Sequence, residues 1–406
     1  MKKSSVFFTV MSSAVTLAVL CSCNQSGGSN STAEQFAQSS TSARSAARDI
    51  PDHLGSLPCD PVGFNNAEEV LFQCSADLLS LEGAVRPSLA VWRGGESLEP
   101  ISDPVAGKQF FITGFTDNGA IVGNVVNAVD VSSGGTIGFQ SSYVAGFVSL
   151  GGNTQYLEKR FISQVSRSGE YLLTGEIFDD GSTGNEDSVV HNGKSIKYSP
   201  APADIQILPS GVNDSGTMFG FAYTSNPEQT FNARYGFTRD ATHFNLYPAP
   251  GRAEVSAVDS ILLNDHGSLL LTYDSDVTYP FHFTGLDGEE LSGSSPIRRA
   301  LLQTSDGVTY ALDSANPKLQ TDPSLINNRD VVLVYQFEPS PESTQASTLF
   351  FSPRSGLKPA DEVLPGLGTA SIYFLNDKNQ IIVDVGGPGG DGRPTHLQLM
   401  QLPEDF

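Results

Sequence analysis

Short apolar runs separated by compact polar turns cover the chain from about residue 50 onward, and one turn recurs. It reads apolar, Asn, Asp, any residue, Gly, apolar, and its clearest copy is 211–220. Six further copies begin at residues 63, 114, 164, 262, 325 and 374, so successive starts lie 51, 50, 47, 51, 63 and 49 residues apart. This near-constant spacing indicates an internal repeat of about fifty residues.

Each copy has the chemistry of a tight β-hairpin. The side chains of Asn213 and Asp214 can hydrogen-bond the turn backbone, and Gly216 can take a positive φ without steric cost. These Asn residues are therefore interpreted as structural, not catalytic. The Gly216 position is held in the other copies by Gly119, Gly169 and Gly267, by the tolerant residues Asp330 and Asn379, and by Glu68, which fits poorly.

Each turn is followed by a third and a fourth short apolar strand. The third strands are expected at Leu89–Trp92, Ala145–Val148, Tyr235–Thr238 and Phe281–Phe283. Four strands per fifty residues predict an all-β protein, a single β-propeller with seven four-stranded blades, because one blade cannot bury both its faces alone. The interval of 63 residues contains an extra hairpin-like piece near residues 300–312, an insertion or a degenerate eighth blade, so six or eight blades also fit.

The two ends of the repeat region predict how the ring closes. The last repeat ends with a strand at Thr395–Leu402 and lacks a fourth strand, and Asp52–Leu57 is a strand candidate ahead of the first turn. An N-terminal strand that completes the last blade would leave no open sheet edge. Cys59 and Cys74 flank the first turn and are expected to form a disulfide in an oxidising compartment.

The first fifty residues predict export and lipidation. Lys2 and Lys3 precede a mostly apolar run from Val6 to Leu20, as in a signal peptide spanning residues 1–22. The exit Leu20-Cys21-Ser22-Cys23 resembles a bacterial lipobox, which implies acylation of Cys23; cleavage before Cys21 and an ordinary signal peptide remain the alternatives. The Ser-, Gly-, Asn- and Gln-rich residues 23–50 are expected to be a flexible tether, followed by the propeller at 51–406.

The charge balance narrows the partners. The chain carries a formal charge of −22, and loss of Lys2 and Lys3 with the signal peptide leaves about −24. Such acidity argues against nucleic acid, whose binding depends on Lys and Arg, and against binding to anionic lipid. We therefore expect a monomer that contacts the membrane only through its lipid anchor, in the cell envelope and on the periplasmic or surface-exposed side of the outer membrane.

Together the repeats resemble the bacterial extracellular repeat family called HAF. Residues 211–220 are similar to that family's Ile-Asn-Asp-x-Gly-x-Val-Val-Gly repeat, and Leu54–Leu57 to its Leu-Gly-x-Leu strand. The His-Ala-Phe triplet that names the family corresponds here to Ala-Val-Trp, Gly-Phe-Val, Gly-Phe-Thr and Phe-His-Phe. The resemblance covers about residues 52–402 and implies a fold and an extracellular location, but no reaction.

No short catalytic motif accompanies the repeats. The six histidines form no closely spaced metal pair, and the sequence contains neither a Gly-x-Ser-x-Gly elbow nor a phosphate-binding loop. The variable loops between the second and third strands are the expected binding face. The run 179–187 offers oxygens at alternating spacing, as a calcium loop would, but it lacks the Asp-x-Asp-x-Asp-Gly order and also fits a solvated acidic loop. The candidate binding or calcium residues are Asp179, Asp180, Asn185 and Asp187, with Asp274 and Asp276 on another loop; the metal, if any, is unknown, and no other cofactor is expected.

Two functions fit these observations. The first is an anchored, non-enzymatic propeller that binds a protein or a glycan at the cell envelope. The alternative is a glycan-active enzyme, because carboxylates from distant blades can converge at the axis without any local motif.

Overall fold

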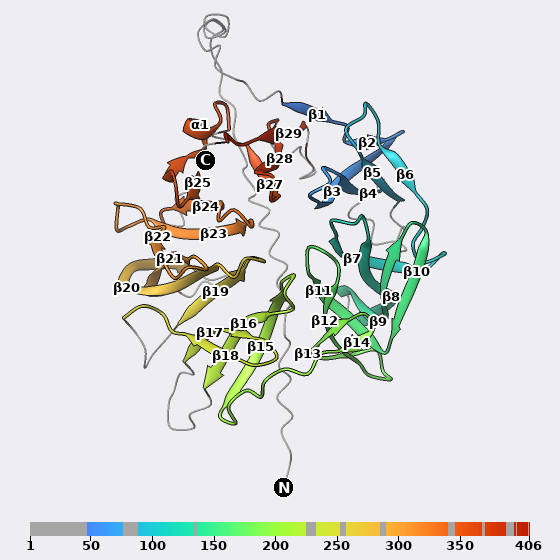
Figure 1. Ribbon diagram of the computed structural model, residues 1–406, viewed down its shortest axis with the longest axis horizontal. Helices are drawn as coiled ribbons and strands as arrows, with labels where there is room; N and C mark the ends of the chain where they lie inside the picture. The colour runs from blue at the N-terminus through green and yellow to red at the C-terminus, as the bar shows by residue number, and fades with distance from the viewer. Residues whose placement is uncertain are drawn as a thin grey trace, which may run out of the picture.

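The protein is described as a computed structural model that covers residues 47–75, 88–133, 136–224, 233–251, 257–284, 290–339, 346–367, 370–386, 394, 396–404 and 406. These residues form seven antiparallel sheets that follow one another around a common axis (Figure 1). The predicted all-β, seven-bladed propeller is therefore confirmed. The cysteine expected to be acylated, Cys23, lies outside the described residues.

The first four blades lie in chain order. Blade one contains β2 (His53–Leu54), β3 (Leu57–Phe64), β4 (Val70–Cys74), β5 (Ser88–Trp92) and β6 (Glu99–Ile101). Blade two contains β7 (Gln109–Phe115), β8 (Ile121–Ser133), β9 (Thr136–Leu150) and β10 (Asn153–Glu158). Blade three contains β11 (Arg160–Val165), β12 (Tyr171–Ile177), β13 (Thr183–His191) and β14 (Lys194–Ser195). Blade four contains β15 (Ile205–Val212), β16 (Met218–Thr224), β17 (Arg234–Arg239) and β18 (Phe244–Tyr247).

The last three blades complete the ring. Blade five contains β19 (Val258–Leu263), β20 (Leu269–Thr284), β21 (Glu290–Gln303) and β22 (Thr309–Ala311). Blade six contains β23 (Gln320–Ile326), β24 (Val332–Phe337), β25 (Ala346–Ser352) and β26 (Gly356–Pro359), followed by the short helix α1 (Ala360–Val363). Blade seven contains β27 (Ser371–Leu375), β28 (Gln380–Asp384), β29 (Leu397–Gln401) and β1 (Arg48–Ile50). The first strand of each repeat lies nearest the axis (Figure 1).

The recurring turn joins the first and second strands of every blade, as predicted. The position assigned to glycine has a positive φ in all seven copies, including Asp330 (60°), Asn379 (59°) and the poorly fitting Glu68 (66°). Because strand two runs from this turn to the next one, the turns between strands two and three lie at the opposite face. The ring therefore has a turn face, made by the repeated Asx turns, and a loop face, made by the loops between strands two and three.

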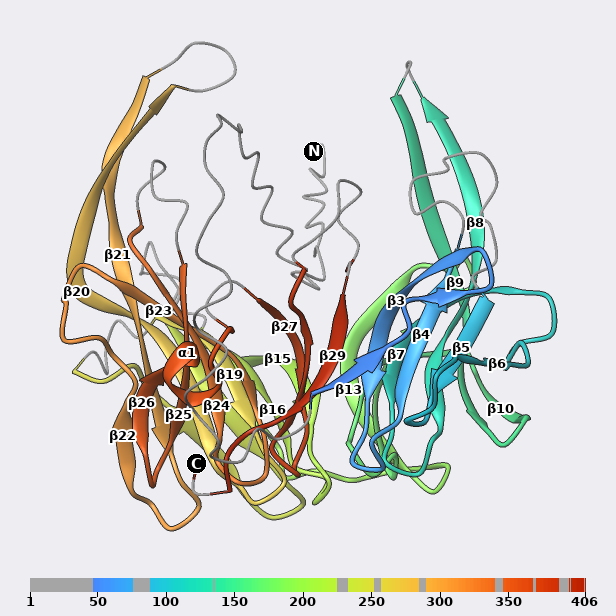
Figure 2. The same cartoon turned by 90° about the horizontal axis from the view of Figure 1, so that it is seen from above.

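Two hairpins project from the loop face. The pairs β8–β9 and β20–β21 are much longer than their counterparts and stand on opposite sides of the ring (Figure 2). The prediction that Phe281–Phe283 forms a third strand was wrong, because these residues continue β20 into the long hairpin. The extra piece near residues 300–312 is the normal third-to-fourth-strand hairpin of blade five, where Leu301 faces Ala311. The interval of 63 residues thus reflects a longer hairpin, not an eighth blade.

Blade seven is completed from both ends of the chain. Arg48–Ile50 pairs antiparallel with Leu397–Leu399, so an N-terminal strand supplies the missing fourth strand. The strand candidate Asp52–Leu57 was placed slightly too late in the chain. Its residues instead turn at Gly55 and form a small hairpin in which His53–Leu54 pairs with Leu57–Pro58 of blade one. The propeller accordingly begins at Arg48, just ahead of the expected boundary.

Apolar side chains fill every junction between neighbouring blades. One buried cluster joins blades two and three through Val122, Ile162 and Leu172, and comparable clusters occupy the other six junctions. Trp92 and Phe72 of blade one pack against Ile382 and Leu399 of blade seven, so the closing junction is as apolar as the rest. Burial between blades is therefore what holds the ring together.

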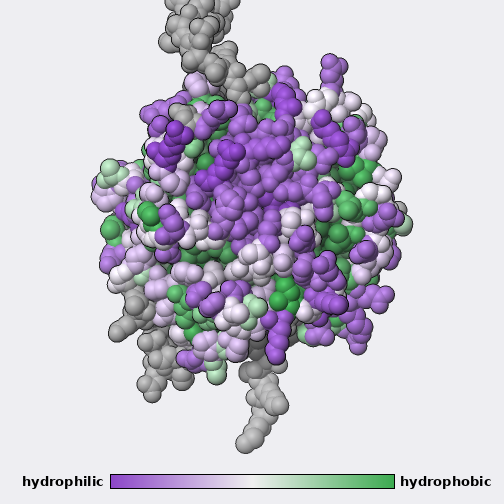
Figure 3. Space-filling view, in the orientation of Figure 1, coloured by the Kyte–Doolittle hydropathy of each residue, from purple (hydrophilic) through white to green (hydrophobic). Residues whose placement is uncertain are grey.

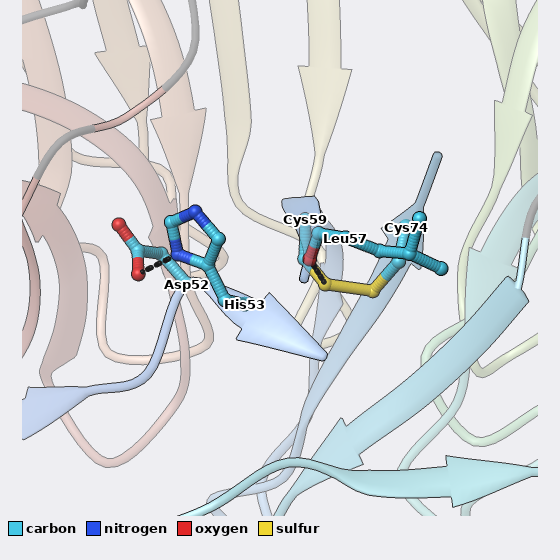
Figure 4. The surroundings of a disulfide bond; sticks show 5 residues. All are labelled: Asp52, His53, Leu57, Cys59 and Cys74. Atoms are coloured by element: carbon cyan, nitrogen blue, oxygen red, sulfur yellow. Dashed lines mark hydrogen bonds and ion pairs between the residues drawn. A yellow bond between two sulfur atoms is a disulfide. The ribbon is translucent and has the colours of Figure 1, made fainter. Parts of the chain in front are cut away.

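The expected disulfide is present. Cys59 in β3 and Cys74 in β4 lie directly opposite each other in the ladder, with Cα atoms 4.0 Å apart, and their sulfur atoms are bonded (Figure 4). Both residues are buried in the cluster between blades seven and one. The bond thus locks the first hairpin of blade one, which meets blade seven at the closing junction, called the closing seam below.

Candidate functional site

In five of the seven repeated turns, the first residue is an Asn whose side chain fastens its blade to the next. Asn213 Nδ2 donates to the backbone oxygen of Asn264, 3.1 Å away in the following blade, and Asn327 Nδ2 donates to that of Asn376 at 2.8 Å. Asn65, Asn264 and Asn376 make the same bond across their own junctions. All five side chains are buried, so these bonds are shielded from water. The Asn residues are structural, as expected, but they join blades as well as shape turns.

The second residue of each turn forms another ring, next to the first. Backbone N–H groups of Asn66, Asp214, Asp265, Asn328 and Asp377 each donate to a side-chain oxygen of the equivalent residue in the next blade, at 2.6–2.9 Å. Blades two and three lack the first-position Asn, and there Asp117 N donates to Arg167 O, and Ser168 N to Asp214 Oδ1. Hydrogen bonds thus cross all seven junctions.

Amides and carboxylates alternate along part of this second ring. Asn328 Nδ2 lies 2.8 Å from Asp265 Oδ2 and 2.9 Å from Asp377 Oδ2, and Asn66 Nδ2 lies similarly between Asp377 and Asp117. Arg167 adds an ion pair to Asp377, 3.1 Å away, from blade three to blade seven. Polar surface covers the centre of this face, opposite the long hairpins (Figure 3). Each of these carboxylates is committed to a neighbouring blade, so this ring is a structural device and not a catalytic pair.

Glu68 shows why a poorly fitting residue occupies the glycine position in blade one. Its carboxylate pairs with Arg48 of β1 at 2.5 Å and with Lys378 of blade seven at 3.6 Å. Hydrogen bonds from Gln380 and then Arg48 lower the pKa of Glu68 below its usual value. The strained turn therefore places a charge across the closing seam, a role that its local sequence did not reveal.

The proposed calcium loop, residues 179–187, lies on the loop face and comprises the turn after β12 and the first residues of β13. The Asp179 side chain is exposed and pairs with Lys159 at 3.1 Å. Asp180 Oδ1 accepts hydrogen bonds from the hydroxyl and backbone N–H of Ser182, and the hydroxyl bond is the main cause of its lowered pKa. Asn185 is exposed on β13, and the side chain of Asp187 lies outside the described residues. The two described carboxylates are thus engaged in local contacts.

The other two candidates, Asp274 and Asp276, lie on β20 of blade five. Asp274 is half-buried and Asp276 is exposed, and blade four separates both from the loop at 179–187. Within the described part of the chain, no three His, Cys, Asp or Glu side chains gather closely enough to hold a metal ion. The two candidate groups therefore do not form one site.

A charged network that sequence reasoning missed joins blades four, five and six. Asp259 of β19 accepts from Arg234 of β17 at 3.0 Å and from Arg298 of β21 at 2.9 Å. Arg298 also pairs with Asp322 of β23 at 3.0 Å, and the Gln320 side chain lies against the same guanidinium. The four charged side chains remain 27–35% exposed. Because innermost strands run from the loop face to the turn face, Asp259 and Asp322 lie on the loop side of the ring.

Asp259 departs from the repeat. The innermost strand of the other six blades has a β-bulge three residues before the turn's first Asx position, for example at Val62, Ser210 and Ser324. In blade five the bulge falls two residues earlier, at Asp259 itself. Bulges re-aim side chains and are common beside functional sites. The displaced bulge is thus associated with the one inner-strand carboxylate that receives two arginines in the described structure.

At the inner-strand position of Asp259 and Asp322, some blades of the ring carry polar residues and others carry apolar residues. The position five residues before each turn is held in chain order by Asp60, Phe111, Phe161, Leu208, Asp259, Asp322 and Ser371. Polar residues therefore occupy blades five, six, seven and one, and apolar residues occupy blades two, three and four. Phe111 is 51% exposed, an unusual state for a large aromatic side chain on an inner strand. Two residues further on, the buried hydroxyl of Thr113 has no hydrogen-bond partner within the described structure.

Burial and charge act against each other at Asp322. Desolvation raises the pKa of this carboxyl above its usual value, and the positive charge of Arg298 opposes that rise. The arginine therefore helps to keep a half-buried carboxylate ionised at neutral pH.

The fold and its contacts define a seven-bladed β-propeller with a hydrogen-bonded turn face and a loop face that carries two long hairpins and a charged network. No protein-family model matches the sequence, and no curated protein matches it significantly. Among solved structures, the chain is similar to a catalytically inactive variant of virginiamycin B lyase from Staphylococcus aureus, solved with quinupristin: 9% sequence identity, TM-score 0.35, over 87% of this chain and 99% of that one. At these values the similarity carries no argument about activity. The described residues include no helix that is both long and apolar enough to cross a bilayer.

Proposed function

We propose that this protein is a lipid-anchored envelope propeller that binds a protein or glycan ligand and does not catalyse a reaction on it. The observation that carries the proposal is the contrast between the two faces. Hydrogen bonds between blades occupy the polar groups at the centre of the turn face, whereas the loop face carries the two long hairpins and the network around Asp259. Varied loops on a rigid ring are where binding residues usually lie. The monomeric state and the anchor at Cys23 belong to this proposal.

The anchor can be tested by fractionation. Wild-type protein should label with radioactive palmitate in cells and sediment with the outer membrane, and Cys23→Ser should abolish both. Cys21→Ser is the matched control and should leave both unchanged. Membrane association that survives Cys23→Ser would remove the anchor from the proposal.

Binding can be tested by replacing one face at a time. A variant in which residues 127–142 are replaced by a two-residue turn should lose capture of its ligand from protein and glycan fractions of the envelope. Asp306→Asn, on the turn face of blade five, should retain it. Equal capture by both variants would show that the blade-two hairpin is not part of the binding surface.

A second candidate is a carboxylate-dependent glycan-active enzyme. One observation favours it: Asp259 and Asp322 flank a single guanidinium, and burial raises the pKa of Asp322, as a general acid requires. This function predicts release of reducing ends from a glycan by the wild-type protein and loss of that release in Asp322→Asn. Unaltered glycan recovered after binding would exclude it.

A further inference from the structure

We infer that the network of Arg234, Asp259, Arg298 and Asp322 is a binding site for an uncharged, hydroxyl-rich glycan. This inference rests on the proposed function and specifies its site and ligand class. The two guanidinium groups and two carboxylates of these residues pair with one another, so none of the four is an unpaired charge that would select an anionic or a cationic ligand. Its alternating donors and acceptors match neighbouring hydroxyl groups, each of which donates and accepts hydrogen bonds.

The network is held in place before any ligand arrives. Arg298 is fixed by two carboxylates and lies against Gln320, and the guanidinium of Arg234 lies 5.4 Å from the centroid of the Phe221 ring while it pairs with Asp259. Fixed side chains lose little entropy on binding, which is the main advantage of a preorganised site. Partial exposure leaves the network accessible to solvent and therefore to a ligand.

The displaced bulge gives independent support. Six blades share one bulge position, so the repeat itself requires nothing different of blade five. In the described residues, the other junctions are fastened without a comparable network on the inner strands. An ion pair that only held two blades together would therefore not require the bulge to move to Asp259. The change places Asp259 between Arg234 and Arg298, which is the centre of the proposed site.

The apolar half of the ring supplies the second element of glycan recognition. Sugar rings present apolar C–H faces as well as hydroxyls, and an exposed aromatic side chain is a suitable surface for such a face. Phe111, on the inner strand of blade two, is such a residue. The inner strands therefore carry hydroxyl-binding groups in blades five and six and an exposed aromatic side chain in blade two.

The experiment measures binding to an immobilised array of soluble neutral polysaccharides: β-glucans, mannans, xylans and chitin oligomers. Wild-type protein should bind at least one of them, and Asp259→Asn and Asp322→Asn should each weaken that binding at least tenfold. Phe111→Ala should weaken it severalfold without touching the ion pairs. Asp306→Asn is the matched control, the same chemical change in blade five at a turn that lies on the opposite face, and should bind as wild type does.

Thermal unfolding of each variant separates binding from folding. Phe111→Ala should unfold at the wild-type temperature because its side chain is half exposed, so its weaker binding cannot come from misfolding. Absence of binding to every glycan on the array, or binding that all three site variants retain, would overturn the inference. If the protein instead captures an envelope protein, and Asp259→Asn retains that capture, the proposed function stands and the glycan site does not.

Discussion

Asn328 is one residue on which the amide–carboxylate pattern of the turn face depends. Its amide nitrogen donates to Asp265 and Asp377, which are two blades apart. Asn328→Asp would keep the shape but place three carboxylates in a row and remove both donors. We expect a loss of about 2–4 kcal/mol in unfolding free energy at pH 7.5, from two lost charge-assisted bonds and the new repulsion.

The pH dependence of this variant provides the sharper test. Crowded carboxylates bind protons more tightly in the folded state than in the unfolded one, so the destabilisation should shrink as pH falls toward about 4. Urea unfolding at pH 7.5 and 4.5 measures the difference from wild type at each pH. Asn118→Asp, the same change at an exposed position, is the control. A pH-independent loss would mean that the two lost hydrogen bonds, not the repulsion between carboxylates, are responsible.

Asp240 gives a second prediction for a single residue, and here the pKa of the folded state is lowered instead of raised. The backbone N–H of Thr242 and then that of His243 lower the pKa of Asp240 to about 2. A depressed folded-state pKa stabilises the protein above the unfolded value of about 4, and that contribution is lost as pH falls from about 4 to about 2. Asp240→Asn should therefore lower the melting temperature at pH 6 and lose part of the acid sensitivity. Carboxyl NMR titration of Asp240 checks the pKa directly, and a wild-type melting temperature for Asp240→Asn at pH 6 would contradict the prediction.

At the scale of elements, the sequence predicted the turns well because their chemistry is local. Positive φ at Gly216 and its six equivalents follows from residues within the turn itself. The displaced bulge at Asp259 and the partners of Arg298 could not be predicted in this way. They depend on strands from other blades, and nothing in the local pattern of β19 distinguishes a bulge at residue 259 from one at 261.

Hairpin length was the other element-scale difficulty. The apolar runs of β20 and β21 fit two long strands as well as three shorter ones. In addition, the bulge between Asp274 and Thr278 interrupts the alternation of apolar and polar residues along β20. The sequence of the Phe281–Phe283 run therefore predicts a separate strand. Only the pairing of Phe281 with Gly293 shows that both strands continue outward.

The disulfide is an element-scale device that can be removed cleanly. It closes a loop with a sequence separation of 15 residues between β3 and β4. A loop of this length corresponds to roughly 3 kcal/mol of unfolded-state entropy. The double variant Cys59→Ser, Cys74→Ser should lose about that much in urea unfolding and should no longer respond to reductant. If the wild-type protein were equally stable with and without reductant, the bond would not contribute to stability.

At the scale of the whole molecule, closure depends on three residues at the start of the described chain. Arg48–Ile50 covers the edge of β29, and Ile50 is buried in the cluster between blades seven and one. Deleting residues 1–51 should expose that edge, lower the melting temperature and promote self-association in size-exclusion chromatography. Deleting only residues 1–46 keeps β1 and should change neither property. Equal behaviour of the two truncations would show that the seam closes without β1.

The sequence supports the whole-molecule architecture better than it supports the site. Seven repeats with an incomplete last copy are sufficient to predict a closed ring, because each blade must bury its faces against neighbours. The network at Asp259 and the chain of bonds from Asn65 to Asn376 join residues from different repeats, 24 to 311 positions apart. Such contacts become visible only when the ring is assembled.

The location of the seam also has a mechanical consequence. Residue 47 is continuous with β1, so any force transmitted along the N-terminal segment reaches the ladder between β1 and β29 before it reaches any other blade. The ion pairs of Glu68 with Arg48 and Lys378 and the adjacent disulfide lie beside that ladder. The joint that would carry the pull of an anchored chain is thus the one that the ion pairs of Glu68 cross, next to a hairpin of blade one that the disulfide holds together.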